Sequence, residues 1–208
     1  LGQYFEENGL MGIEGVDTRM LTIKLREQGV MLAALLTGSD DGHEAVRLAQ
    51  NAPVQETREL IPDVTCKEAY HMPGSGKKIA VLDLGCRKSI LQSLQNRGAD
   101  LYVYPYGTPA DVILADNPQA LFLTNGPGYP FAAPKAVETV KNILGTIPVQ
   151  GVCMGTEIIA AALGSEVEKL RLGHRGASQP VRFSDGSVAV TYQGHGYAVV
   201  GDSLPEGC

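Results

Sequence analysis

Between residues 79 and 164, short apolar segments alternate with amphipathic ones, and a glycine or proline separates most of them. The apolar segments have strand length and cover residues 79–84, 101–104, 120–124 and 148–152. The segments with helical spacing cover residues 88–97, 109–115, 134–144 and 157–163. Strands that alternate with helices over short connections form parallel sheets with both faces covered. The sequence therefore predicts an α/β fold with a mostly parallel sheet and helices on both faces.

Three regions are predicted along the chain. Residues 1–50 indicate part of a small α+β domain, with helices over 1–8 and 19–28, an apolar strand over 30–37 and a short helix up to Gln50. Residues 51–76 are rich in proline and glycine and lack periodicity, which is typical of a linker. Residues 77–208 form the α/β domain. Near its end, residues 181–183 and 188–191 flank a Ser-Asp-Gly turn and predict a hairpin, and 198–200 are a further strand candidate.

Composition excludes several classes of function. The formal net charge is −6, so the chain offers no basic face for nucleic acid and no polybasic membrane anchor. The longest apolar runs, at 30–36 and 158–163, fall far short of the ~20 residues that span a bilayer. Four cysteines without a CxxC pair favour free thiols in the cytoplasm. The chain starts without methionine and ends just after a Pro-Glu-Gly turn, which suggests a fragment.

Cys153 is the strongest candidate for a catalytic residue. Gly151 and Gly155 flank it at minus two and plus two, between a predicted strand and a predicted helix. This is the spacing of a nucleophile elbow, a turn so tight that flanking side chains would collide. The helix N-terminus favours the thiolate, and the backbone N–H of Met154 is placed to stabilise an oxyanion. The alternative is a buried structural cysteine, the commoner fate of cysteine in general.

A glycine-rich turn follows the preceding strand. It contains Asn125, Gly126, Pro127 and Gly128, and the N–H of Gly126 is placed to complete an oxyanion hole. An ordinary glycine-rich loop explains this turn equally well. It is not a phosphate-binding loop, because no Gly-Lys-Ser/Thr follows it.

The remaining cysteines and the histidines give weaker signals. Cys86 lacks a glycine at plus two and is expected to be a small core residue, and neither Cys66 nor Cys208 suggests chemistry. A cysteine nucleophile needs a histidine base oriented by a carboxylate. His174 and His195 lie in the α/β domain without such a neighbour and are expected to be structural. The base is therefore missing from this chain, and no metal site is predicted.

These motifs, taken together, resemble those of a known family. The elbow around Cys153 and the turn at residues 124–128 resemble the class I, or triad, glutamine amidotransferases. Residues 12–27, the Asp-Leu-Gly segment at 83–85, and the segments at 173–180 and 193–199 are similar to the small, glutamine-hydrolysing subunits of carbamoyl-phosphate synthases. The resemblance spans nearly the whole chain and implies a flavodoxin-like amidotransferase domain, truncated at its C-terminus. It also implies that residues 1–50 end the family's N-terminal domain.

The resemblance implies an activity and its partners. L-Glutamine would be hydrolysed through a thioester on Cys153. Ammonia would pass through a channel to a large, ATP-using subunit, which makes carbamoyl phosphate for arginine and pyrimidine synthesis. The small subunit would itself bind no cofactor, ATP and Mg²⁺ being used by the large partner. By position, the residues that the resemblance places in the glutamine site are Gly126, Gly128, Met154, Glu157, Gly194, Gly196 and Tyr197.

The chain departs from the family pattern at several positions. Thr156 and Glu157 stand where the family usually has His-Gln, Tyr129 stands in place of aspartate, and Gly194 in place of asparagine. A carboxylate at Glu157 would raise the pKa of the thiol, although it could accept a hydrogen bond from the substrate. The family's His-Pro-Glu, which supplies the base, lies beyond the point where this chain stops. The 208-residue chain alone is therefore expected to be inactive.

Two other functions stay open at this point. The substitutions would also suit a catalytically impaired docking or regulatory subunit that resembles an amidotransferase. A third hypothesis is another cysteine-elbow hydrolase that acts on γ-glutamyl compounds. Asp17, Thr18 and Arg19 argue against it, because the resemblance ties that segment to the synthase subunit.

Overall fold

The computed structural model describes residues 1–53 and 58–206. The chain divides into two compact units, Leu1–Val54 and Gln55–Cys208. The first unit holds three helices, α1 (Gly2–Glu7), α2 (Thr18–Gln28) and α3 (Gly42–Gln50). Aspartates cap two of them: Asp17 accepts a hydrogen bond from the N–H of Met20, and Asp41 accepts from the first turn of α3.

The strand predicted over residues 30–37 does not form. No strand ladder includes these residues in the part of the chain that the structure describes, and Val30, Met31 and Leu32 expose about half of their surface. Gly29 is the one buried residue among the described residues of the first unit. A strand needs a neighbour that pairs with its backbone and a core that covers its side chains. The apolar run has neither within this unit, and the prediction was wrong.

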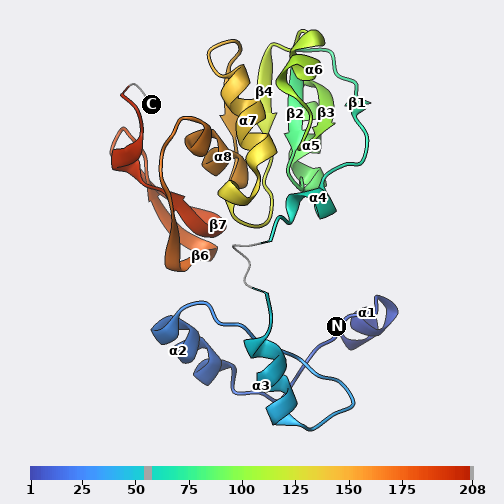
Figure 1. The fold of residues 1–208 in the computed structure, drawn as a ribbon, viewed down its shortest axis with the longest axis vertical. Helices are drawn as coiled ribbons and strands as arrows, with labels where there is room; N and C mark the ends of the chain where they lie inside the picture. Colours follow the sequence, from blue (N-terminus) through green and yellow to red (C-terminus); the bar gives the residue numbers. More distant parts are fainter. Residues whose placement is uncertain (54–57, 207–208) are drawn as a thin grey trace. The chain divides into compact units, whose positions relative to one another are not determined.

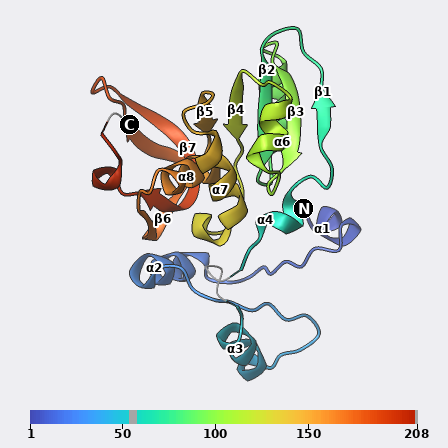
Figure 2. The ribbon, with the colours of Figure 1, turned by 45° about the horizontal axis from the view of Figure 1, so that its top comes forward.

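The second unit is built on a five-stranded sheet. Its strands are β1 (Tyr70–Met72), β2 (Lys78–Asp83), β3 (Asp100–Pro105), β4 (Ala120–Leu123) and β5 (Val149–Gly151). They lie in the order β1-β3-β2-β4-β5; Figure 1 labels the first four of them, and Figure 2 labels β5 as well. Every pairing is parallel except that of β1 with β3. The chain moves outward from β2 in both directions, first to β3 and then to β4, so a topological switch point lies between the loops that follow β2 and β4.

Helices cover both faces of this sheet, and alternate side chains of β2 show how. Ala80 and Leu82 join the core beneath α6 (Ala110–Ala115), α7 (Pro134–Ile143) and α8 (Met154–Ala162). Val81 points the other way and packs with Leu91 of α5 (Lys88–Gln95). Figure 2 shows the helices around the strands from a second direction. The predicted α/β fold with a mostly parallel sheet is confirmed.

The predicted linker is partly folded, which corrects the interpretation of residues 51–76. A short helix, α4 (Ile61–Val64), and strand β1 both lie within it. Ile61 is 2% exposed. His71 pairs with Asp100 at 2.7 Å and holds the pKa of that carboxyl below its usual value. Three prolines and two glycines suggested a linker, but these segments are fixed by tertiary contacts that local sequence does not record.

Replacing Thr65 tests whether the segment 58–76 is part of the folded domain. Its buried hydroxyl donates to the carbonyl of Asp83 at 2.7 Å and accepts from the N–H of Tyr106 at 3.1 Å. Thr65→Ala leaves both groups without that partner, so we expect the free energy of unfolding to fall by about 1–3 kcal/mol in urea titrations. Thr146→Ala, at an exposed threonine, is the control and should change it by less than about 0.5 kcal/mol. Equal values for the two variants would contradict this role of Thr65.

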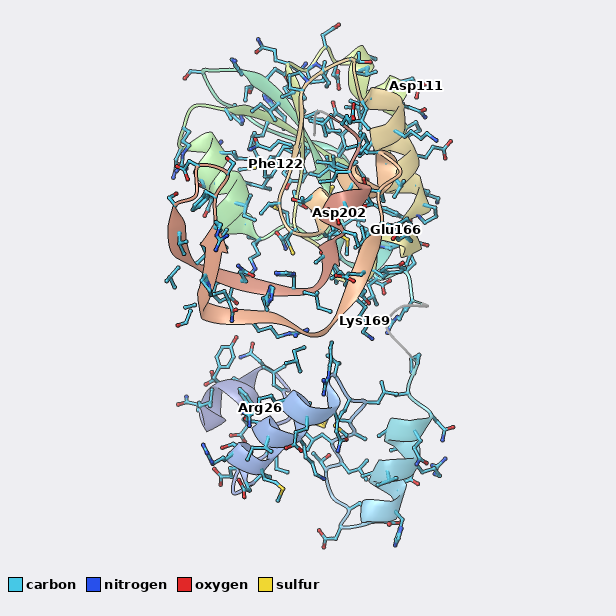
Figure 3. All side chains as sticks on the ribbon, turned by 90° about the vertical axis from the view of Figure 1, so that its left-hand side faces the viewer. Arg26, Asp111, Phe122, Glu166, Lys169 and Asp202 are labelled. Atoms are coloured by element: carbon cyan, nitrogen blue, oxygen red, sulfur yellow. The ribbon has the colours of Figure 1, made fainter. Side chains whose placement is uncertain are left out.

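A long two-stranded hairpin completes the unit. Strands β6 (Val167–Arg182) and β7 (Val188–Val199) pair antiparallel around the predicted turn, and they extend well beyond the predicted hairpin (Figure 3). A 3-10 helix, η3 (Gly201–Ser203), follows. Val167 and Tyr197 pack against Ala160 of α8. The hairpin is thus joined to the helix that begins beside Cys153.

Candidate active site

Three loops meet at the carboxyl edge of the sheet, because β2, β4 and β5 are neighbours. The hydroxyl of Thr124 accepts from the N–H of Leu84 at 2.9 Å, and the carbonyl of Thr124 accepts from the N–H of Gly155 at 3.1 Å. Asn125 donates to the carbonyl of Gly85 at 3.1 Å. A Cβ at Gly126 would lie 2.3 Å from the carbonyl oxygen of Leu84. Glycine at 126 therefore permits the close approach of the loops after β2 and β4.

Cys153 occupies a strained turn at the start of α8. Its φ is +54° and its ψ is −119°, and Asn117 is the other non-glycine residue with positive φ in the described chain. A Cβ at Gly151 would lie 2.5 Å from the carbonyl carbon of Gly155, and one at Gly155 would lie 2.6 Å from the oxygen of Leu123. Neither position has room for a side chain. The geometry is that of a nucleophile elbow, where strain of this kind is typical of functional sites.

A small pocket opens above this turn. Its volume is about 180 Å³, below the ~300 Å³ typical of pockets for drug-sized ligands, so it suits a small metabolite. The structure brings every residue predicted for the site to its wall. These are Cys153, Gly126, Gly128, Met154, Glu157, Gly194, Gly196 and Tyr197. They come from the loop after β4, from the elbow and α8, and from β7.

The predicted site residues did not include Arg175 or His195, although both lie in segments, 173–180 and 193–199, that the family resemblance covers. Both line this pocket, Arg175 from β6 and His195 from β7. His195 and Cys153 also line a larger cavity of about 940 Å³, which shares part of its wall with the small pocket. The resemblance marked the segment that contains Arg175 but did not single out this residue, because only the register of the hairpin shows which residues of β6 lie opposite the substrate-site segment of β7.

Cys153 is exposed as a whole residue, and the pKa of its thiol is raised above the usual value. Partial burial of the sulfur is the larger cause, and the carboxylate of Glu157 adds to it. The backbone amide of Met154 and the side chain of Arg87 act in the opposite direction. The predicted preference for thiolate is therefore not met in the free protein, because desolvation and a nearby negative charge outweigh the helix N-terminus.

Glu157 is a buried carboxylate at the pocket wall. Its side chain projects from the first turn of α8, and the residue is 7% exposed. Burial raises its pKa, and His195 partly opposes this. A carboxylate in such a place favours a cation or a hydrogen-bond donor as its ligand.

His195 is held by contacts within the hairpin. Its Nδ1 lies 2.7 Å from the carbonyl oxygen of Tyr197, and its Nε2 lies 2.9 Å from the side-chain oxygen of Gln193 and 3.2 Å from Nδ1 of His174. These contacts are consistent with the structural role predicted for both histidines. His195 nevertheless reaches the pocket wall, so it contributes to the electrostatics of the site.

The residues that depart from the family pattern have local partners here. Tyr129 packs on Tyr197 with ring centroids 5.1 Å apart and fixes β7 against the loop after β4. The hydroxyl of Thr156 donates to the carbonyl of Gly151 at 3.0 Å, across the elbow. A Cβ at Gly194 would have nothing nearer than 3.9 Å, so this position leaves open space.

The other described cysteines lie away from the pocket. Cys86 is partly buried and packs against the core on the α5 face, and burial, with Asp83 adding to it, raises the pKa of its thiol to about 11. Cys66 is also partly buried against this core, with a thiol pKa of about 11 for the same reasons. Cys86 therefore lies at the edge of the core in which it was expected, and Cys208 lies outside the described residues. Within residues 1–53 and 58–206 there is no group of three or more side chains suited to a metal ion.

Glu157 offers a test of the electrostatics at Cys153. Glu157→Gln removes the carboxylate that raises the thiol pKa, so alkylation of Cys153 by iodoacetamide should move to lower pH. We expect the rate below the thiol pKa to rise severalfold, and by no more than about tenfold, the change for one pKa unit. Glu138→Gln, an exposed carboxylate on α7, is the control for net charge. An unchanged pH profile in Glu157→Gln would contradict this account.

Comparison with known proteins decides the family. Residues 80–208, more than half of the chain, match the family model for glutamine amidotransferase class-I. The chain belongs to the class I glutamine amidotransferases. Residues 1–35 match a second model, the CPSase domain of the carbamoyl-phosphate synthase small chain.

Curated relatives of this amidotransferase narrow the family further. It is 48% identical over 212 residues to the carbamoyl phosphate synthase small chain of Methanosarcina acetivorans, covering 97% of this chain and 58% of the relative. It is 38% identical over 207 residues to the carbamoyl phosphate synthase pyrimidine-specific small chain of Bacillus subtilis, covering 99% and 56%. The chain thus spans just over half the length of these relatives. The resemblance to the small chains is confirmed.

A solved structure supports the fold of the amidotransferase domain. A Thermoplasma acidophilum protein described as part of a GMP synthase aligns with a TM-score of 0.53 at 20% identity, covering 62% of this chain and 69% of that one. At this identity the likeness concerns the fold alone. No helix among the described residues is long and apolar enough to cross a membrane.

Proposed function

We propose that this chain carries the glutamine-hydrolysing site of a carbamoyl-phosphate synthase small subunit. The observation that carries the proposal is Cys153, an exposed residue in a strained elbow at the wall of a pocket for a small molecule. The backbone amides of Gly126 and Met154 belong to residues of the same wall. The names of the curated relatives support the same assignment.

The chemistry follows from this arrangement. The thiolate of Cys153 attacks the carbon of the γ-carboxamide of L-glutamine, and the carbonyl oxygen takes the negative charge, stabilised by backbone N–H groups. The C–N bond then breaks, the nitrogen takes up a proton and leaves as ammonia, and a γ-glutamyl thioester remains. Water cleaves the thioester, releasing glutamate and restoring the thiol.

The partner is proposed from the family. Ammonia would pass through a channel to a large subunit, which uses ATP and Mg²⁺ to make carbamoyl phosphate in the cytoplasm. The product would serve pyrimidine synthesis, as the name of the Bacillus subtilis relative supports, and arginine synthesis. The small chain itself would bind neither ATP nor Mg²⁺.

One observation favours a second candidate function, an impaired docking subunit. The thiol pKa of Cys153 is raised, and a buried carboxylate contributes to that shift. A nucleophile that is mostly protonated near neutral pH reacts slowly unless substrate binding or a base activates it. In that case the partner would use free ammonia and the small chain would only assemble with it.

Trapping the acyl intermediate separates the two functions. The natural full-length protein is mixed with L-glutamine, quenched with acid and digested, and the peptide that carries Cys153 is examined by mass spectrometry. We expect a γ-glutamyl adduct on Cys153, together with ammonia release. No adduct and no ammonia, from folded protein with its partner present, would contradict the glutaminase and support the docking role.

A further inference from the structure

The small pocket above Cys153 has charges of opposite sign on its wall. Glu157 contributes a buried carboxylate from α8, and Arg175 contributes a guanidinium from β6. The mechanism proposed above gives Glu157 no hydrogen-bond donor and gives Arg175 no role. A pocket with both signs of charge is suited to a zwitterion, which is the form of a free α-amino acid at neutral pH.

The register of the hairpin brings Arg175 to this pocket. Arg175 lies directly opposite Gly194 across the β6–β7 ladder. Residues that face each other across antiparallel strands extend their side chains on the same face of the ladder. Because Gly194 has no side chain, Arg175 meets no side chain from its direct partner on that face. The open space at Gly194 agrees with this, since the nearest neighbours of a Cβ there would be atoms of Tyr192 at 3.9 Å.

Local contacts then orient the guanidinium. Nη1 of Arg175 donates to the carbonyl of Leu172. Nη2 lies 3.3 Å from the position that a Cβ would take at Gly196, a residue of the pocket wall. A side chain at 196 would press on the guanidinium, so the glycine allows it to lie against the backbone of β7 at the edge of the pocket.

We propose that Arg175 binds the α-carboxylate of the substrate and that Glu157, on the wall of the same pocket, receives the α-ammonium. The inference rests on the proposed function and adds a specificity-determining residue to it. A guanidinium is the side chain best suited to pair with a carboxylate through two parallel hydrogen bonds. With both ends of the zwitterion held, the γ-carboxamide extends toward Cys153. The site therefore selects ω-amides of free α-amino acids over amides that lack the α-carboxylate.

The test compares two ligands in several variants. The natural full-length protein with Cys153→Ala is used, so that turnover does not interfere, and calorimetry measures the Kd of L-glutamine and of 4-aminobutanamide, which is glutamine without its α-carboxylate. We expect L-glutamine to bind about 10- to 100-fold more tightly, the effect of a hydrogen-bonded charge pair. Adding Arg175→Met should remove most of this preference. Arg182→Met, at an exposed arginine of the same strand, should keep it.

The readout is the ratio of the two affinities within each variant, so a general loss of stability does not imitate the effect. Arg175→Lys keeps the positive charge but loses the bidentate geometry, and it should retain part of the preference. An unchanged ratio in Arg175→Met, with tight glutamine binding, would overturn the role of Arg175 and leave the proposed glutaminase intact. Failure of the Cys153→Ala protein to bind L-glutamine at all would overturn both.

Discussion

Replacing Cys153 with serine is expected to stop ammonia release from L-glutamine, lowering kcat by about 10³-fold or more. The substitution changes a single atom, so the elbow keeps its shape and the pocket keeps its volume. A serine hydroxyl at this position ionises far less readily than a thiol. The measurement is glutamate dehydrogenase-coupled detection of ammonia, with the natural full-length protein and its large partner.

Cys86→Ser is the matched control for this prediction. Cys86 also follows a strand of the sheet and precedes a helix, but it packs against the core on the α5 face and lies outside the small pocket. Its replacement should leave kcat within about twofold once the folded fraction is taken into account. Full glutaminase activity in the Cys153→Ser variant would show that Cys153 is not the nucleophile and would overturn the proposed function. Synthesis of carbamoyl phosphate from added ammonium should persist in that variant, because this reaction does not need the thiol.

The core of the amidotransferase domain could be predicted from sequence because its signals are local. The periodicity of each segment located β2 to β5 and α5 to α8 to within a few residues. Glycines located the elbow because a Cβ at 151 or 155 would collide with backbone, a requirement that short-range geometry imposes. Five of the eight predicted site residues, Gly126, Gly128, Cys153, Met154 and Glu157, line one pocket because the carboxyl ends of neighbouring parallel strands meet at one edge. The other three, Gly194, Gly196 and Tyr197, lie on β7 and were predicted from the family resemblance alone.

The features that the sequence did not indicate depend on contacts with residues far away along the chain. β1 lies in a segment rich in proline and glycine, and it is a strand because β3 pairs with it. Residues 30–37 have a stronger local strand pattern but no partner among the described residues, so they form none. Arg175 was part of a segment that the family resemblance covered, but its place opposite Gly194 follows from the register of a hairpin much longer than the pattern suggested.

The raised pKa of the Cys153 thiol belongs with these non-local effects. A helix N-terminus close in sequence predicted a stabilised thiolate, but burial and Glu157 shift the balance toward the thiol. The proposed substrate contact would oppose one of these two causes. An α-ammonium next to Glu157 would offset the charge of the carboxylate and so reduce its contribution to the raised thiol pKa.

Gly155→Ala is expected to damage both stability and catalysis. The new Cβ would lie 2.6 Å from the oxygen and 2.7 Å from the Cβ of Leu123, a residue buried in β4. Because backbone oxygen is among the colliding atoms, α8 must move away from the sheet. We expect the free energy of unfolding to fall by about 1–3 kcal/mol, the usual cost of overpacking. A displacement of Cys153 by even ~1 Å should lower kcat/KM by about 10²-fold.

Urea unfolding and the ammonia assay, applied to the same preparations, measure the two losses separately. Gly201→Ala is the control, because a Cβ there meets nothing within 4 Å and the residue has no positive φ. It should alter neither quantity appreciably. If Gly155→Ala kept full activity and stability, the close contact between α8 and β4 would not be what positions the thiol. Loss of activity at unchanged stability would instead show that α8 can shift at little cost in free energy, and that the shape of the elbow alone determines the position of the sulfur.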